Sequence, residues 1–236
     1  MSEEKAKNIL EISENNKING LRAAVLGAND GVVSTAGLIF GVAGATNNKA
    51  AIFTAGLAGL IAGAISMAVG EYVSVSTQRD TERAFIDREK KLLRDEPDNQ
   101  LQHLAAFYEV KGVSHDTAMQ FARELTAKDP IKAHLEAELQ LDEDDLTSPV
   151  TAAVSSFFSF TGGALIPLLA AVLSNDQWRM KVTLMAVVLG LFITGFYSAK
   201  FGGASKGTAI KRVIIGGVVA MAVTYAIGRL FGTAIS

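Results

Sequence analysis

Residues Ala50–Gly70, AAIFTAGLAGLIAGAISMAVG, decide the fold because they run for 21 residues without a charged side chain. About 20 apolar residues are enough to span the hydrocarbon core of a bilayer. Four other segments are similarly apolar: Ala23–Ala45, Val150–Leu173, Val182–Ala199 and Val213–Gly228. The last reaches spanning length if Ala209–Ile235 forms one helix. The sequence therefore predicts an all-α, polytopic membrane protein with five transmembrane helices.

Charge is distributed unevenly along the 236 residues, of which 19% are charged and 49% hydrophobic. Residues 77–148 contain 17 of the 24 acidic residues and 10 of the 22 basic ones, but one of the 22 glycines. We interpret this segment as a small helical insert between the second and third spans. The expected organisation is an amphipathic N-terminal segment at 1–19, two spans at 20–76, the cytoplasmic insert at 77–148, and three spans at 149–236.

Lysine and arginine set the expected orientation. With a cytoplasmic N-terminus, 18 of the 22 basic residues lie inside, and four lie outside: Lys49, Arg179, Lys181 and Arg229. The positive-inside rule therefore favours a cytoplasmic N-terminus and an external C-terminus. Residues 1–19 lack the apolar core of a signal peptide. The net charge of -2 gives no support to a nucleic-acid partner, and the absence of cysteine excludes disulfides and thiolate metal sites.

Two acidic residues, Asp30 and Glu71, lie within or at the end of the apolar segments. A charge at mid-membrane costs at least about 2.5–3.5 kcal/mol unless it faces a cavity, a partner or a cation. The apolar parts of the first two spans contain no lysine or arginine, so we expect a metal ion or a proton as the partner. Asn29 offers an amide oxygen beside Asp30. Met67 shares a helix face with Glu71, and a thioether near carboxylates suits a transition metal better than Mg²⁺ or Ca²⁺.

Ordinary lipid or core packing is the simpler interpretation of Met67 taken alone, and a cap at the membrane surface is the competing interpretation of Glu71. Glycines four residues apart predict close helix contacts, either as general packing or at a dimer interface formed by the first two spans. These pairs are Gly27 and Gly31, Gly37 and Gly41, Gly59 and Gly63, and Gly228 and Gly232.

The insert is expected to form helices at 77–95, at 100–111, from Ser114 to 128, and from Asp129 to about 141. Carboxylates and imidazoles on different helices are suitable ligands for Fe²⁺, Mn²⁺ or Zn²⁺. The candidates are Glu82, Glu89, His103, His134 and Glu138. A solvated charged face is the competing interpretation.

Three motifs resemble the vacuolar iron transporter family. They are LGANDGVVSTAGLIFGVAGA at Leu26–Ala45, GAISMAVGEYVSVSTQRD at Gly63–Asp80, and GGALIP at Gly162–Pro167. The resemblance extends over essentially the whole chain and includes the position of the insert. It implies a homodimeric, proton-coupled exporter of Fe²⁺ and often Mn²⁺ from the cytosol, with a metal path between the first two spans of both subunits.

The resemblance also implies roles for individual residues. Asp30 and Met67 match the family's metal-contacting Asp and Met, and Glu71 matches a position that is acidic in some branches. Another second-span carboxylate of the family falls on Gly59 here. In the insert, Glu89 and Glu138 match metal-collecting glutamates. His134 stands at a Met position, and Gln100 and His103 stand at Glu positions.

We therefore expect a transporter rather than an enzyme, with the bilayer, protons and divalent metal as partners and no permanently bound cofactor. Fe²⁺ or Mn²⁺ is the expected substrate, with Zn²⁺ and Co²⁺ as further candidates. The host membrane would be the plasma membrane of a prokaryote or the vacuolar membrane of a eukaryote. A passive metal channel and a membrane-anchored storage or oxidase module are the alternatives. A di-iron site needs paired Glu-x-x-His motifs, whereas His103 and His134 follow Gln100 and Ile131.

Overall fold

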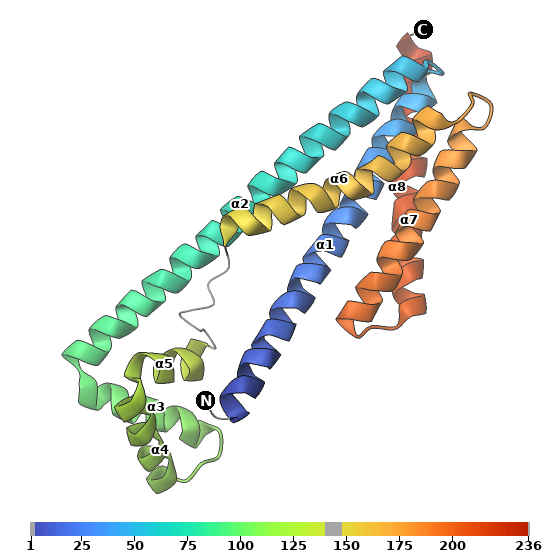
Figure 1. Ribbon diagram of the computed structural model, residues 1–236. Coiled ribbons are helices and arrows are strands. Elements are labelled where there is room, and N and C mark those ends of the chain that lie inside the picture. The colour runs from blue at the N-terminus through green and yellow to red at the C-terminus, as the bar shows by residue number, and fades with distance from the viewer. Residues whose placement is uncertain (1–2, 140–147, 236) are drawn as a thin grey trace. The chain divides into compact units, whose positions relative to one another are not determined.

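The computed structural model describes residues 3–139 and 148–235, and every regular element within these ranges is helical (Figure 1). Side chains are described for residues 24–137 and 148–232. The long helices are α1 (Glu3–Ala45), α2 (Lys49–Asp95), α6 (Pro149–Leu173), α7 (Arg179–Gly202) and α8 (Lys206–Ile235). The shorter elements are α3 (Pro97–Val110), α4 (His115–Lys128), α5 (Pro130–His134) and the π-helical turn η1 (Leu135–Leu139).

Five helices are long and apolar enough to cross a membrane: α2, α6 and α7, together with Ala24–Ala45 of α1 and Lys206–Gly232 of α8. This confirms the predicted all-α fold with five spans. α8 begins at Lys206, so the short apolar segment at its centre does belong to one long helix.

The chain divides into two compact units. The spanning unit consists of Met1–Glu71 and Ala152–Ser236, and the insert unit consists of Tyr72–Thr151. The expected boundaries were 76/77 and 148/149. α2 continues from its apolar span into the charged first helix of the insert without a break. α1 is likewise continuous from Glu3, so residues 3–19 extend the first span rather than form a separate helix.

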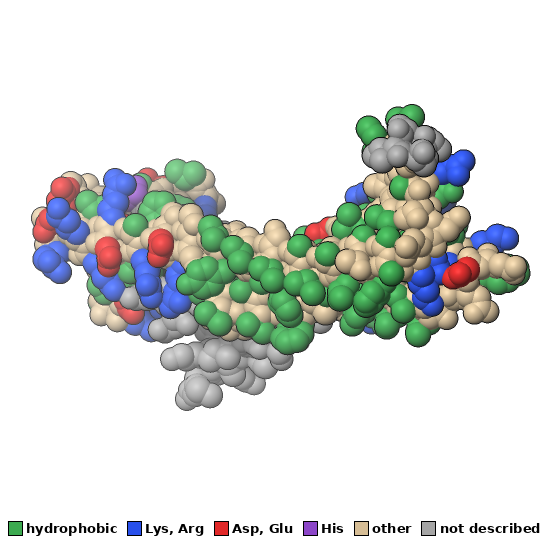
Figure 2. All heavy atoms as spheres, turned by 90° about the horizontal axis from the view of Figure 1, so that it is seen from above, with side chains coloured by type: hydrophobic (Ala, Val, Ile, Leu, Met, Phe, Trp, Pro, Cys, Tyr) green, Lys and Arg blue, Asp and Glu red, His purple; other side chains and the backbone are tan. Residues whose placement is uncertain are grey.

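The core of the spanning unit draws on all five long helices. Its buried side chains include Ile39 of α1, Leu60 of α2, Phe160 of α6, Leu191 of α7 and Met221 of α8. Many large apolar side chains point outward instead, and green side chains cover much of the spanning helices in Figure 2. A water-soluble protein rarely leaves so much contiguous apolar surface exposed, whereas lipid tails cover it in a membrane.

Glycine lets α1 approach two other helices at backbone distance. A Cβ placed on Gly163 of α6 would fall on the backbone carbonyl of Ala28, and one on Gly31 would fall on the α6 backbone. A Cβ on Gly228 of α8 would fall on the carbonyl of Gly41. Small residues permit this approach in lipid. The α1 glycines that meet α6 and α8 therefore serve packing within one chain.

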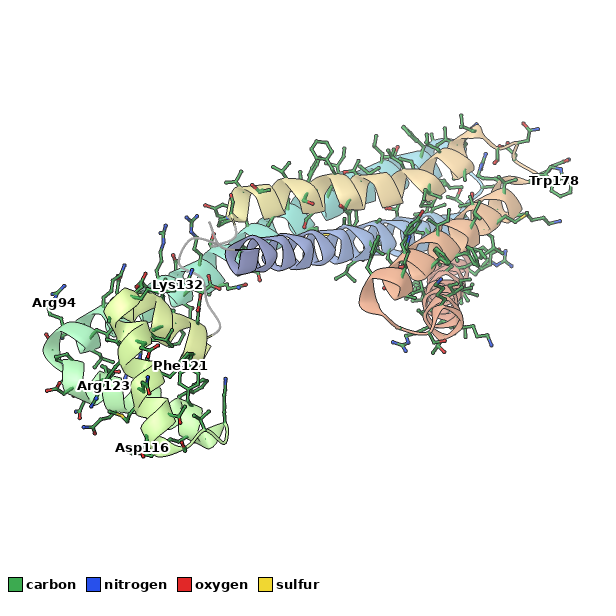
Figure 3. The ribbon with its side chains drawn as sticks, turned by 60° about the horizontal axis from the view of Figure 1, so that its bottom comes forward. Arg94, Asp116, Phe121, Arg123, Lys132 and Trp178 are labelled. Carbon is green, nitrogen blue, oxygen red and sulfur yellow. The ribbon has the colours of Figure 1, made fainter. Side chains whose placement is uncertain are left out.

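A buried arginine joins two of the turns that connect the spanning helices. The guanidinium of Arg179, at the start of α7, pairs with Asp176 and donates to the backbone oxygen of Asn47 at 3.4 Å. Asn47 lies in the turn between α1 and α2, so this hydrogen bond ties that turn to the start of α7. Trp178 beside it is exposed, with Lys181 over its ring at 4.8 Å, as is common at a membrane surface (Figure 3).

The insert unit has a small core of its own. Leu104 and Ala105 of α3 pack against Ala118 and Ala122 of α4 and Ala133 of α5. Charged side chains such as Arg94, Asp116, Arg123 and Lys132 point away from this core (Figure 3). Burial, and to a lesser extent the carboxylate of Glu136, raises the pKa of Tyr108, whose ring contacts Phe121 edge-on.

Local signals place most of the insert helices as expected. Asp129 caps α5 through its side chain, which accepts from the Lys132 backbone N–H at 3.0 Å. Gly112 follows α3 with a φ of 95°, a conformation that favours glycine. The expected start of α3 at Gln100 was wrong, because Pro97 occupies the first helical turn. The expected end of the last helix near residue 141 lies outside the described residues.

The close contact between α1 and α6 predicts that alanine substitutions at two neighbouring glycines, Gly162 and Gly163, affect stability differently. Gly163→Ala should lower the thermal stability of the detergent-solubilised protein by about 1–3 kcal/mol, the usual cost of overpacking, because the methyl group meets the Ala28 backbone. Gly162→Ala should be neutral or slightly stabilising, since nothing lies within 4 Å of its Cβ position. Fluorescence-detected size exclusion after heating measures both, and equal melting curves would contradict the packing.

Candidate functional site

Four exposed residues form a line along α1 at intervals of four. Leu26, Asp30, Ser34 and Leu38 are exposed, and we call them the Asp30 stripe. Residues four apart lie on one side of a helix. The other side of α1 is buried against α6, α7 and α8, so the only charged residue of the span is left on its open side.

Asp30 receives a hydrogen bond from within its own helix. The Ser34 hydroxyl donates to Oδ1 of Asp30 at 2.7 Å. No ion pair reaches Asp30 from the residues that the structure describes. An ionised carboxylate offers about four acceptor positions, of which Ser34 uses one. The arrangement therefore suits a proton or a cation that arrives from outside the fold.

Met67 lies where α2 passes α1. It is half-buried, and its terminal methyl is 3.3 Å from the Cβ position of Gly27, three residues before Asp30 on α1. Glu71 follows one turn later on α2, half-buried at the end of the spanning unit. The structure thus places Met67, a predicted metal ligand, beside the segment of α1 that carries Asp30.

Asn29 has a different setting from the one expected. Its side-chain oxygen accepts a hydrogen bond at 3.3 Å from the hydroxyl of Thr194, on α7. The amide oxygen expected to lie beside the Asp30 carboxylate is therefore engaged with another helix. Sequence reasoning missed Thr194, although it is one of the few polar residues within an otherwise apolar span.

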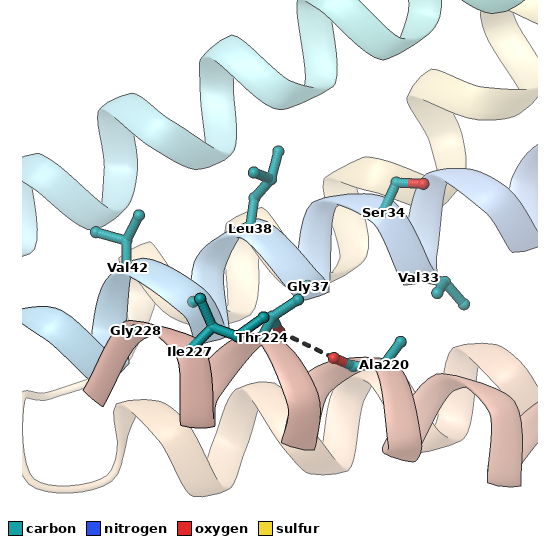
Figure 4. Close-up of a pocket in the computed structure, with 10 residues that line it drawn as sticks. Val33, Ser34, Gly37, Leu38, Val42, Ala220, Thr224, Ile227 and Gly228 are labelled. Atoms are coloured by element: carbon teal, nitrogen blue, oxygen red, sulfur yellow. Dashed lines mark hydrogen bonds between the residues drawn. The ribbon is translucent and has the colours of Figure 1, made fainter. Parts of the chain in front are cut away.

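An apolar groove between α1 and α8 begins beside the stripe. It is lined by Ser34, Gly37, Leu38 and Gly41 of α1, and by Thr224 and Gly228 among residues of α8. Figure 4 shows the Ser34 hydroxyl at one end of the groove and Val42 at the other. The hydroxyl of Thr224 is satisfied within α8, at 3.0 Å from the Ala220 oxygen. The groove is therefore a surface for apolar contacts.

In the insert, the structure brings two of the predicted ligands together. Nδ1 of His134 lies 3.2 Å from Oε1 of Glu89, with the imidazole fully buried and the carboxylate side chain 13% exposed. Glu89 comes from α2 and His134 from α5, 45 residues later. This is a buried polar contact between two helices of the insert unit.

The other predicted ligands of the insert are not gathered at this pair. Glu82 accepts a hydrogen bond from Gln78 on its own helix at 2.8 Å, and His103 is exposed on α3. The side chain of Glu138 lies outside the described residues. Within the part of the chain that the structure describes, no three histidine, aspartate or glutamate side chains are close enough to hold a metal ion.

Five helices are long and apolar enough to span a membrane, and the first carries a carboxylate that no described basic residue neutralises. These features define a polytopic membrane protein of the ion-handling class. A sequence model of the VIT family matches residues 21–229. The vacuolar iron transporter of Acanthamoeba castellanii is 40% identical over 215 residues, which cover 90% of this chain and 79% of that protein. The chain belongs to the VIT family.

Plant relatives show the same extent of similarity. Vacuolar iron transporter homolog 1 of Oryza sativa subsp. japonica is 38% identical, over 90% of this chain and 74% of its own length. Homolog 2.1 of Arabidopsis thaliana is 35% identical, over 95% and 87% respectively. The members of this family are transporters, which agrees with the expectation of a transporter rather than an enzyme.

The Glu89–His134 contact predicts different costs for two glutamates on one helix. Glu89→Ala should destabilise the insert by about 1–3 kcal/mol, because it leaves a buried imidazole facing the lost carboxylate. Glu82→Ala, two turns earlier, removes a carboxylate that accepts a hydrogen bond from Gln78 on its own helix, and it should change the stability by less than about 0.5 kcal/mol. Hydrogen exchange of α5 amides, followed by mass spectrometry on the full chain, measures both. Equal exchange in the two variants would contradict a structural role for the contact.

Proposed function

We propose that this protein exports Fe²⁺ or Mn²⁺ from the cytosol in exchange for protons. The observation that carries the proposal is Asp30, a carboxylate on the open side of an apolar helix that no basic side chain among the described residues neutralises. Relatives named vacuolar iron transporters support iron as the substrate. The N-terminus would be cytoplasmic and the C-terminus outside, in the plasma membrane of a prokaryote or the vacuolar membrane of a eukaryote.

The exchange rests on competition for one set of oxygen atoms. A carboxylate must lose its proton before it can bind a metal ion, so metal binding releases a proton and protonation releases metal. Asp30 would alternate between these states, with the Ser34 hydroxyl fixing one oxygen. The Met67 thioether would favour a transition metal over Mg²⁺, and Glu71 would pass metal or protons at the end of the path.

A second copy of the chain would complete the site. In the single chain the Asp30 stripe is exposed, and a carboxylate facing lipid is costly. Two chains related by a twofold axis along the first two spans would shield both carboxylates and place them on one path. Such a homodimer would offer a metal ion two carboxylates and two thioethers.

The insert would collect metal on the cytoplasmic side. Glu89 and His134 already lie 3.2 Å apart, and their oxygen and nitrogen lone pairs are also those that bind Fe²⁺, Mn²⁺, Zn²⁺ or Co²⁺. Glu82, His103 and Glu138 would add ligands as metal arrives. His134 stands where the family has a methionine, so its imidazole replaces a thioether. This replacement would influence which of these ions the insert binds.

Asp30→Ala should reduce metal flux into proteoliposomes with a pH gradient by at least about 100-fold. Loss of a residue that only supports a metal ligand already costs up to about 100-fold, and Asp30 is proposed to be a ligand itself. The matched control is Asp116→Ala, which removes an exposed carboxylate of the insert. Both variants should elute as folded protein. Wild-type flux in Asp30→Ala would overturn the mechanism. Metal flux through the wild-type protein that does not depend on the proton gradient would indicate a passive channel.

The proposed dimer is open to cross-linking because the chain has no native cysteine. Single cysteines at Leu26, Ser34 and Leu38 should yield disulfide-linked dimers in oxidised membranes for at least one position, since bridged Cα atoms lie within about 7 Å. Met185→Cys on α7, 73% exposed, serves as a control on a different helix. If all three stripe variants remain monomeric, or if Met185→Cys cross-links equally well, the Asp30 stripe is not the dimer interface.

A further inference from the structure

Thr194 forms a polar contact between two spanning helices at the level of the candidate site. Its side chain is almost buried, at 9% exposure of the residue. The hydroxyl has a single proton, which two acceptors share: Oδ1 of Asn29 on α1 at 3.3 Å and the Leu191 oxygen of its own helix at 3.2 Å. By contrast, Thr183 on the same helix is fully buried and donates only to the Arg179 oxygen, at 2.8 Å.

The partner of Thr194 is the residue directly before Asp30. Successive residues of an α-helix are about 100° apart, so anchoring Asn29 on α7 fixes the direction in which Asp30 points. The closest contacts of α1 with its other neighbours are backbone approaches at glycine: Ala28 and Gly31 meet α6, and Gly41 meets α8. The Asn29–Thr194 contact joins two helices through polar side chains directly beside the carboxylate, and in apolar surroundings an amide oxygen without a donor is unfavourable.

We propose that Thr194 is a positioning residue for metal transport, which holds α1 through Asn29 so that Asp30 is presented to the metal path. Asn29 is then an anchor between helices rather than a metal ligand. This inference rests on the proposed role of Asp30. It assigns a function in transport to α7, a helix that contributes no predicted ligand.

The kinetic test compares three variants in proteoliposomes. Thr194→Val keeps the shape but removes the hydroxyl, and it should raise the KM for Fe²⁺ about 3- to 15-fold, the range that corresponds to interhelical hydrogen bonds in membranes. Thr194→Ser should restore the wild-type KM. Thr183→Val, which removes a hydroxyl bonded only within α7, should leave the KM unchanged. A smaller amount of folded Thr194→Val with an unchanged KM would show a purely structural role and overturn the inference.

A second readout does not depend on transport. Asp30→Cys gives a single thiol, which a membrane-impermeant maleimide should label through the metal path. Adding Thr194→Val should lower the labelling rate by the same 3- to 15-fold range, whereas adding Thr183→Val should not change it. An equal rate with and without Thr194→Val overturns the positioning role. A thiol that resists labelling even with Thr194 present contradicts the path itself, and the inference falls with the proposed function.

Discussion

The packing of α1 against α6 and α8 is the constraint on which the rest of the spanning unit depends. At Gly163 and Gly228 the backbones approach so closely that a single methyl group would meet the opposite chain. This packing limits how α1 can be rotated, and with it which residues remain on the open side, while the Asn29–Thr194 contact holds the helix at the level of Asp30. Asp30 is exposed because the glycine-bearing sides of the helix are already occupied.

Because an ionised carboxylate facing lipid is energetically costly, Asp30 needs a group that neutralises or shields it. Within one chain, the described residues supply a hydroxyl from Ser34 but no positive charge. A metal ion or a proton can neutralise the carboxylate, and a second subunit can shield it from lipid. In a proton-coupled metal transporter, metal and proton would alternate on Asp30 while the second subunit remains in place. The VIT family is consistent with this account, since its members transport rather than transform their substrate.

The five spans could be predicted because length and the absence of charge define a membrane helix almost independently of its neighbours. The rotation of α1 could not be predicted, because glycine spacing indicates close contact without naming the helix that makes it. Thr194 was missed for a related reason: a threonine in an apolar helix usually bonds to its own backbone, as Thr183 does. Glu89 and His134 were both candidates, but only the folded insert brings residues 45 positions apart to 3.2 Å.

The proposed mechanism requires Asp30 to contact the transported metal within the membrane. Anomalous X-ray diffraction at the manganese edge, from crystals of the full chain grown with Mn²⁺, would locate the metal. A peak is expected within coordination distance of the Asp30 carboxylate, near the Met67 thioether. Manganese peaks confined to the insert, with none beside Asp30, would contradict it.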